Sequence, residues 1–175
     1  MLKIVTAQLK VQPGHPSENT ENMLSMIAQA KAQGADLIIF PEMAVPGYLL
    51  GDTWEQYAFL KDCEECGQDI INASQDIAII FGNVAVDWEK KNYDGRVRKY
   101  NALFTAWQGN LVQPRNMPYP YVIKTLMPNY REFDDTRYFF GSKQLAEEMG
   151  TQADKLIGTV PLTIKGQNYN IGGFL

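Results

Sequence analysis

The sequence predicts an α/β protein built around a mixed sheet. Two segments, 35–40 (ADLIIF) and 77–88 (IAIIFGNVAVDW), carry short apolar runs, which are typical of strands covered on both faces. A segment with apolar residues at helical spacing precedes each of them. Strand-like segments joined by turns follow in the second half. Strands alternating with helices and then hairpins indicate an α/β protein with both parallel and antiparallel pairs.

The chain begins with a predicted strand and an amphipathic helix. Residues 2–9 alternate in polarity like a strand. The helix is expected over residues 17–34, where apolar side chains recur at helical spacing. Its predicted capping residues are Ser17, Asn19 and Thr20 at the start and Gly34 at the end. The second predicted strand, residues 35–40, follows at once.

A second helix and an antiparallel pair of strands are predicted next. The helix is expected over about residues 52–73, with an apolar side formed by Trp54, Phe59, Leu60, Ile70 and Ile71. The strand of residues 77–88 follows it. Tyr93-Asp94-Gly95 is typical of a hairpin tip. Residues 99–107 (KYNALFTAW) return as a strand, and QGN at 108–110 turns the chain into LVQP.

The last third is less regular. Residues 113–142 give no periodic pattern, and a short helix is expected near KQLAEEMG, residues 143–150. Two strands, 158–166 and 168–175, close the sequence. The second of them stops inside an apolar run, so we expect the 175 residues to be part of a longer chain.

Composition excludes several classes of partner. The net charge of −4 argues against nucleic acid, which favours a basic face. The apolar runs are far too short to span a membrane. Two cysteines, without a disulfide framework, fit a reducing compartment. The sequence therefore predicts a soluble, cytoplasmic protein that binds neither nucleic acid nor membrane.

Two charged residues emerge from apolar surroundings far apart in the sequence. Glu42 follows the run LIIFP, and Lys124 follows Val122 and Ile123. A buried charge costs several kcal/mol unless another charge pairs with it. Glu42 and Lys124 could therefore form an ion pair in a single cavity. Alternatively, Glu42 caps a turn in water and Lys124 reaches the surface along its aliphatic stem.

Other polar features predict no site. His15 is the only histidine and lies in a proline-flanked loop, so a Ser-His-Asp triad or a multi-histidine metal site is excluded. Cys63 and Cys66 enclose two glutamates in a predicted helix, which favours a packing or surface role for both thiols. The charged run 89–99 (EKKNYDGRVRK) is expected to be a solvated face. No metal site is predicted.

Two segments carry a resemblance to a known family. FPEMAVPGY, residues 40–48, and KTLMPNYREFDDTRYF, residues 124–139, resemble the first two motifs of the nitrilase (carbon–nitrogen hydrolase) superfamily. GNVAV and KYNALF lie between them in the same order. Within the superfamily the P-N-Y, F-D and R-Y-F elements are most similar to the N-terminal glutaminase domain of glutamine-dependent NAD synthetases. The resemblance implies a nitrilase-type α-β-β-α sandwich with mixed sheets, of which residues 1–175 form a part.

The resemblance also implies roles for individual residues. Glu42 would be a general base, and Lys124 would face the oxyanion of a tetrahedral intermediate. Tyr130, and less directly Tyr48, would contact bound glutamine. Asp135 stands where many members carry a second glutamate, so its supporting role is open. The family nucleophile, a cysteine, would be the residue after Leu175.

What the resemblance implies beyond these residues is a larger enzyme. A synthetase domain that uses ATP and Mg is expected downstream in the same chain, with homo-oligomerisation. The 175 residues themselves need no cofactor, and glutamine is the implied substrate. The alternatives are another carbon–nitrogen hydrolase, such as an amidase or a carbamoyl-amino-acid hydrolase, or a non-catalytic module used for assembly.

Overall fold

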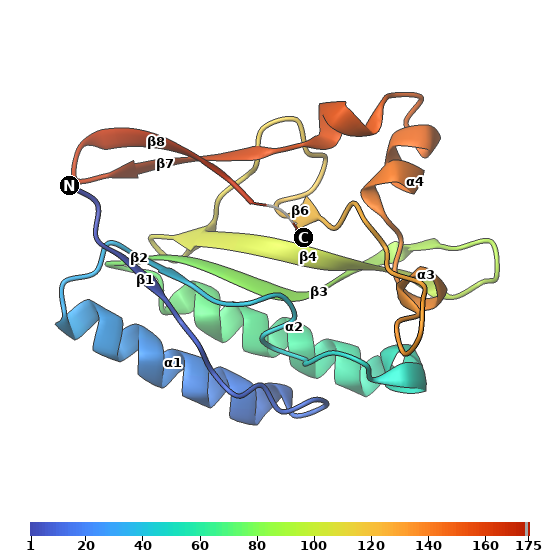
Figure 1. Cartoon of the computed structure of the whole chain (residues 1–175), viewed down its shortest axis with the longest axis horizontal. Helices are drawn as coiled ribbons and strands as arrows, with labels where there is room; N and C mark the ends of the chain where they lie inside the picture. Colours follow the sequence, from blue (N-terminus) through green and yellow to red (C-terminus); the bar gives the residue numbers. More distant parts are fainter. Residues whose placement is uncertain (174) are drawn as a thin grey trace.

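A six-stranded mixed sheet runs through the middle of the protein (Figure 1). The structure is a computed structural model that describes residues 1–173 and 175. The sheet order is β1-β2-β3-β4-β5, and β6 also pairs with β4. β1, β2 and β3 are parallel, and the remaining pairs are antiparallel. The strands are β1 (Ile4–Thr6), β2 (Leu37–Ile39), β3 (Ala78–Lys91), β4 (Val97–Trp107), β5 (Asn110–Leu111) and β6 (Val122–Ile123).

Two layers cover the faces of this sheet. Helices α1 (Pro16–Ala32) and α2 (Tyr57–Asn72) lie along one face, and the hairpin of β7 (Thr159–Ile164) and β8 (Gln167–Gly172) lies over the other (Figure 1). Each interface has an apolar core of its own. The predicted α/β class with a mixed sheet is confirmed. Phe174, in the last predicted strand, lies outside the described residues.

The predicted first helix is present, but its start differs from the prediction. The N-cap is His15, and Pro16 occupies the first turn, where its fixed φ suits a helix. Asn19 is buried and holds the preceding loop instead of capping: its amide donates to the carbonyl oxygens of Gln12 and Val45. The predicted capping by Ser17, Asn19 and Thr20 is therefore wrong. Gly34, with φ of +70°, follows the last turn as predicted.

The predicted second helix is broken. A 3₁₀ turn, η1 (Gly51–Glu55), precedes α2, and Gln56 between them is extended. The break lets Trp54 pack edge-on against both Phe59 and Phe139. The apolar side chains predicted for this helix are all buried. Tertiary packing of one tryptophan therefore overrides a helical pattern that runs through the break.

The segment without a periodic pattern holds two short elements, and two more lie between its end and β7. β6 pairs with β4 through Ile123 and Ala102, and α3 (Asp135–Tyr138) follows a loop. α4 (Ser142–Glu148) is the short helix predicted near residues 143–150, and η2 (Ala153–Leu156) precedes β7. A two-residue strand and single helical turns are too short to produce a period in sequence. β6 and α3 nevertheless place Lys124 and Asp135, of segment 124–139, beside the sheet.

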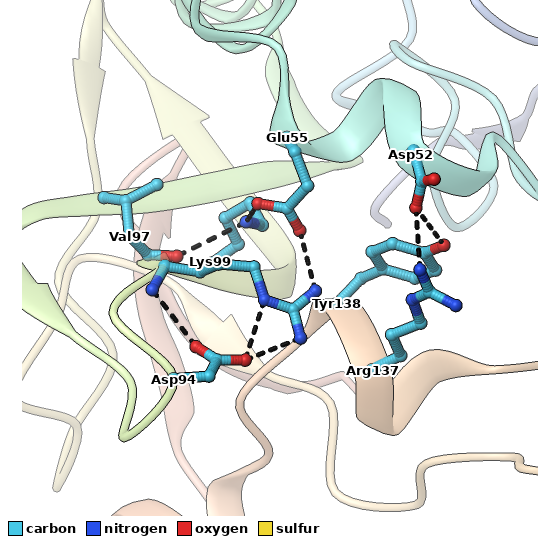
Figure 2. A network of polar contacts seen from close by, with 8 residues as sticks. Asp52, Glu55, Asp94, Val97, Lys99, Arg137 and Tyr138 are labelled. Carbon is cyan, nitrogen blue, oxygen red and sulfur yellow. Dashed lines mark hydrogen bonds and ion pairs between the residues drawn. The ribbon is translucent and has the colours of Figure 1, made fainter.

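The charged run before and along β4 is not simply a solvated face. Lys99 is only 1% exposed, and its ammonium contacts a Glu55 carboxylate oxygen at 2.9 Å. Arg96 bridges Glu55 and Asp94; Figure 2 labels these two carboxylates together with Lys99. Arg98 is buried as well, so the prediction of a solvated face is wrong for Arg98 and Lys99. Their partners come from η1 and α4, which the local charge pattern could not reveal.

A second ion pair lies beside this network. Asp52 of η1 accepts from Arg137 and Tyr138 of α3 at 3.0 and 3.1 Å (Figure 2). These contacts tie α3 to the turn before α2. Within the described part of the chain, no helix is long and apolar enough to cross a membrane.

Candidate active site

Glu42 lies in a tight turn just beyond the end of β2. Phe40 still donates its backbone N–H to Ile80 of β3, and Met43 then takes a left-handed conformation with φ of +49°. Gly82 of β3 lies directly beneath this turn. A Cβ on Gly82 would come within 2.7 Å of the Glu42 Cα. The absence of a side chain at Gly82 therefore lets the turn sit on the sheet and aims Glu42 along its surface.

Replacing Gly82 with alanine is expected to destabilise the fold by about 1–3 kcal/mol, because the added methyl collides with backbone that cannot move aside. Chemical denaturation measures this loss. Gly172→Ala is the matched control, since no described atom lies within 4 Å of its Cβ position. Equal stability of the two variants would contradict the close approach.

Lys124 enters the same region from β6. Its backbone N–H donates to the Asn101 carbonyl oxygen at 3.0 Å, and its own carbonyl accepts from Ser142 at 3.1 Å. The strand and α4 thus fix the backbone on both sides of the residue. The side chain is only 8% exposed. A buried ammonium of this kind needs anionic partners.

Three oxygen atoms surround the Lys124 ammonium. It lies 2.6 Å from Glu42 Oε1, 3.1 Å from Asp135 Oδ2 and 3.0 Å from the Tyr48 hydroxyl. Asp135 is only 3% exposed and begins α3. The predicted contact between Glu42 and Lys124 is confirmed. Asp135 and Tyr48 complete a cluster of four residues from two segments, 40–48 and 124–139, which we call the Lys124 cluster.

The charge states within the Lys124 cluster follow from its contacts. Burial by itself would lower the pKa of Lys124, but the bonds with Glu42, Tyr48 and Asp135 outweigh it and raise that pKa above its usual value. Burial, followed by the bond to Asp135, raises the pKa of the Tyr48 hydroxyl. The lysine is therefore a cation and the tyrosine a neutral donor at physiological pH. The Tyr48 hydroxyl donates to Asp135 Oδ1 at 2.6 Å.

A further polar side chain, which the sequence analysis did not single out, hydrogen-bonds to the cluster. Asn101, in the middle of β4, donates its side-chain N–H to Glu42 Oε1 at 2.6 Å. The available signal was an asparagine within the apolar strand segment KYNALF. A polar side chain there needs a partner from another element.

Hollows flank the Lys124 cluster on two sides. Glu42 lines a hollow of about 270 Å³, together with residues of β4, β7 and β8. Tyr48 and Asp135 line another of about 210 Å³ next to Trp54 and Glu132. The first hollow includes Leu103, Thr105, Val160, Ile171, Gly172, Gly173 and Leu175. A small substrate can therefore reach Glu42 from the side of the β7–β8 hairpin.

The remaining sequence candidates lie outside the cluster. Tyr130 is 62% exposed and lines a separate hollow beside Leu126. It makes no direct contact with the Lys124 cluster among the described residues, but Phe133 packs against both Tyr130 and Tyr48. His15 pairs with Glu18 at the start of α1. Cys63 and Cys66 are both buried in α2, so neither is a surface thiol. Burial raises the pKa of the Cys63 thiol, which disfavours its nucleophilic form.

The arrangement supports acid–base and oxyanion chemistry through carboxylates and one ammonium. In residues 1–173 and 175, no three histidine, cysteine or acidic side chains converge as a metal site. A partly exposed carboxylate touching a buried ammonium can accept a proton while the ammonium faces a developing negative charge.

Comparison with known proteins identifies the family. The sequence pattern of carbon-nitrogen hydrolases matches residues 3–117. The chain belongs to the carbon-nitrogen hydrolase family. This hydrolase chain is 32% identical over 140 residues to the glutamine-dependent NAD(+) synthetase of Synechocystis sp., covering 79% of this chain and 24% of the relative. The synthetase of Aquifex aeolicus is also 32% identical over 139 residues, with 79% and 22% covered.

Solved structures agree with this membership and confirm the predicted nitrilase-type fold. The glutamine-dependent NAD+ synthetase of Acinetobacter baumannii, in complex with ADP, superposes with a TM-score of 0.69 at 27% identity over 97% of this chain and 27% of that one. An amidase from Nesterenkonia sp. has the same fold, with a TM-score of 0.68 at 16% identity over 97% of this chain and 54% of the amidase. The chain spans about a quarter of the length of the curated synthetases it matches.

Proposed function

We propose that this carbon-nitrogen hydrolase domain is the glutaminase part of a glutamine-dependent NAD synthetase. It would hydrolyse the side-chain amide of glutamine and supply ammonia for amidation of nicotinic acid adenine dinucleotide. The observation that carries the proposal is the Lys124 ammonium, held at 2.6 Å from Glu42 and at 3.1 Å from Asp135. Similarity to synthetases along most of the chain supports the choice of glutamine.

The proposed reaction uses each member of the Lys124 cluster. Glu42 takes the proton of a cysteine thiol, and the thiolate attacks the carbonyl carbon of the glutamine side chain. The Lys124 ammonium faces the resulting oxyanion. The C–N bond breaks, Glu42 returns the proton to the leaving nitrogen, and ammonia departs. Water then attacks the thioester while Glu42 takes its proton. The C–S bond breaks, Glu42 returns the proton to the sulfur, and glutamate leaves.

The supporting roles follow from position. Asp135 shares the ammonium with Glu42 and accepts from Tyr48, so it would hold Lys124 in place. Asp135 thus serves as the supporting carboxylate even with a side chain shorter than that of glutamate. Tyr48 and Tyr130 are proposed to contact glutamine, Tyr48 from within the cluster and Tyr130 from the exposed loop after Lys124.

The nucleophile is proposed to come from the residue after Leu175. Gly173 and Leu175 line the hollow that contains Glu42, so chain continuing from there starts beside the proposed base. ATP and Mg²⁺ are assigned to the synthetase domain proposed downstream, and no step above passes through them. Homo-oligomerisation, expected from the resemblance, stays a prediction.

The 175-residue chain alone is expected to release no ammonia from glutamine, because its two thiols are buried in α2. An ammonia assay on the purified chain measures this. Ammonia release that Cys63→Ser or Cys66→Ser abolishes would contradict the proposed nucleophile.

Two measurements on the full-length protein test the function itself. A diazoketone analogue of glutamine should alkylate one cysteine, and peptide mapping by mass spectrometry should locate it directly after Leu175. NAD formation from nicotinic acid adenine dinucleotide and ATP should proceed with glutamine or with free ammonium. Hydrolysis of simple amides without NAD formation would favour an amidase. Absence of labelling and turnover would favour a non-catalytic module.

A further inference from the structure

Two buried asparagines on neighbouring strands use their side chains differently. In the β3–β4 register Asn101 pairs with Val84, so Asn83 and Asn101 point to opposite faces of the sheet. Asn83 faces α2: its amide donates to the Cys63 carbonyl at 2.8 Å, and its oxygen accepts from the Val84 backbone at 2.8 Å. The side-chain N–H and the side-chain oxygen of Asn83 both bind backbone atoms, so the role of Asn83 is structural.

Asn101 lies on the face that carries the Lys124 cluster. Leu103 and Thr105, at alternate positions of the same strand, line the hollow beside Glu42. The Asn101 amide donates to Glu42 Oε1 at 2.6 Å, and its backbone carbonyl accepts from the Lys124 backbone at 3.0 Å. One residue thus fixes the side chain of the proposed base and the backbone of the proposed oxyanion group.

The side chain of Asn101 has an energetic cost that packing does not explain. The residue is fully buried, and its Oδ1 has no hydrogen-bond donor among the described residues. An unsatisfied buried acceptor destabilises the folded state, because it has lost its hydrogen bonds to water without gaining a donor. An apolar side chain at this strand position would avoid that cost. Native proteins keep few such groups, and each one calls for an explanation such as a catalytic role.

We propose that Asn101 is a positioning residue for Glu42. The Glu42 side chain is about one-third exposed, so water competes with Lys124 for its carboxylate. The Asn101 amide binds the oxygen that also contacts the ammonium, and so keeps the carboxylate on Lys124 and beside the hollow. This role rests on the proposed glutaminase reaction, in which Glu42 must meet both a thiol and a leaving nitrogen.

The test compares Asn101→Ala with Asn83→Ala in the full-length protein. Asn101→Ala is expected to lower kcat for glutamine by about 10²-fold, the cost of a base that has moved by about 1 Å. KM for glutamine should stay within about twofold, because Asn101 does not contact substrate. Asn83→Ala should lower thermal stability and keep kcat per folded molecule. Losses of activity that follow stability equally in both variants would overturn the proposal.

Asn101→Asp gives a second readout, the pH–rate profile, which would not change if Asn101 were only structural. The variant keeps the shape of asparagine but turns a carboxylate toward Glu42. Like charges at this distance disfavour the ionised base, so the acidic limb of the pH–rate profile should shift to higher pH. An unchanged profile with wild-type kcat would overturn the proposal, and this near-isosteric variant remains informative if Asn101→Ala fails to fold.

Crystal structures separate this inference from the proposed function. The contact between Glu42 Oε1 and Lys124 Nζ should be lost in Asn101→Ala and kept in Asn83→Ala. If the wild-type protein hydrolyses no glutamine, the proposed function fails, and the position of Glu42 in these structures still decides what Asn101 does. A Glu42 side chain that stays on Lys124 in Asn101→Ala would overturn the positioning role.

Discussion

Replacing Lys124 with alanine in the full-length protein is expected to lower glutamine-dependent kcat by roughly 10²–10³-fold, the scale of a lost oxyanion donor. The ammonium is the one cation that contacts Glu42 and Asp135 among the described residues. Its proposed role is to stabilise an oxyanion that exists only near the transition state. NAD formation with free ammonium should survive, because that reaction bypasses the glutaminase site. Equal loss of the glutamine-dependent and ammonium-dependent reactions would make Lys124 structural.

Stability has to be separated from catalysis in this experiment. Removing Lys124 leaves the nearly buried Asp135 without its cation, and breaking a buried pair in this way costs about 3–5 kcal/mol. Lys124→Ala combined with Asp135→Asn should recover part of that stability but none of the activity. Lys99→Ala is the matched control: Lys99 is also buried against a glutamate, Glu55, but outside the Lys124 cluster. It should destabilise the fold while sparing kcat per folded molecule.

Replacing Glu42 with glutamine is expected to lower glutamine-dependent kcat by about 10²–10⁴-fold, the usual contribution of a general acid–base. The amide has nearly the same shape, and its oxygen can still accept from Lys124 and Asn101, so the fold should change little. Initial rates with glutamine and with free ammonium measure the effect. Glu55→Gln, at the other glutamate–lysine contact, is the control. A Glu42→Gln enzyme within tenfold of wild type would exclude Glu42 as the base.

The strands and long helices could be predicted because their signals are local. β2 and β3 are apolar runs, and α1 has a helical period closed by Gly34. The predictions that were wrong concerned elements whose form depends on residues distant in the sequence. Gln56 breaks the second helix so that Trp54 can reach Phe139, some eighty positions away, and neither residue marks the break in sequence. β6 consists of two residues that become a strand only by pairing with β4.

The candidate site could be predicted in part for the same reason. Glu42 and Lys124 stand out because each is a charge next to an apolar run, and the structure joins them directly. Asp135 and Tyr48 were named from the family resemblance alone, and their contact with Lys124 is visible only in three dimensions. The pattern that paired Glu42 with Lys124 did not reveal the contact between Glu55 and the buried Lys99. Lys99 follows two arginines in the sequence, and Glu55 lies in a predicted helix, so neither charge looks unusual.

The β7–β8 hairpin has a consequence for motion near the site. Its strands pair only with each other among the described residues. Apolar packing attaches the hairpin to the six-stranded sheet, together with an ion pair between Lys165 and Asp36 and a hydrogen bond from the Arg115 N–H to the Thr159 carbonyl. Such a unit can separate in a local opening that leaves the rest of the fold intact. Amide protons of β7 and β8 would then exchange with solvent sooner than those of β3 and β4. Because Gly172 and Gly173 line the hollow beside Glu42, the same opening would admit water to the carboxylate.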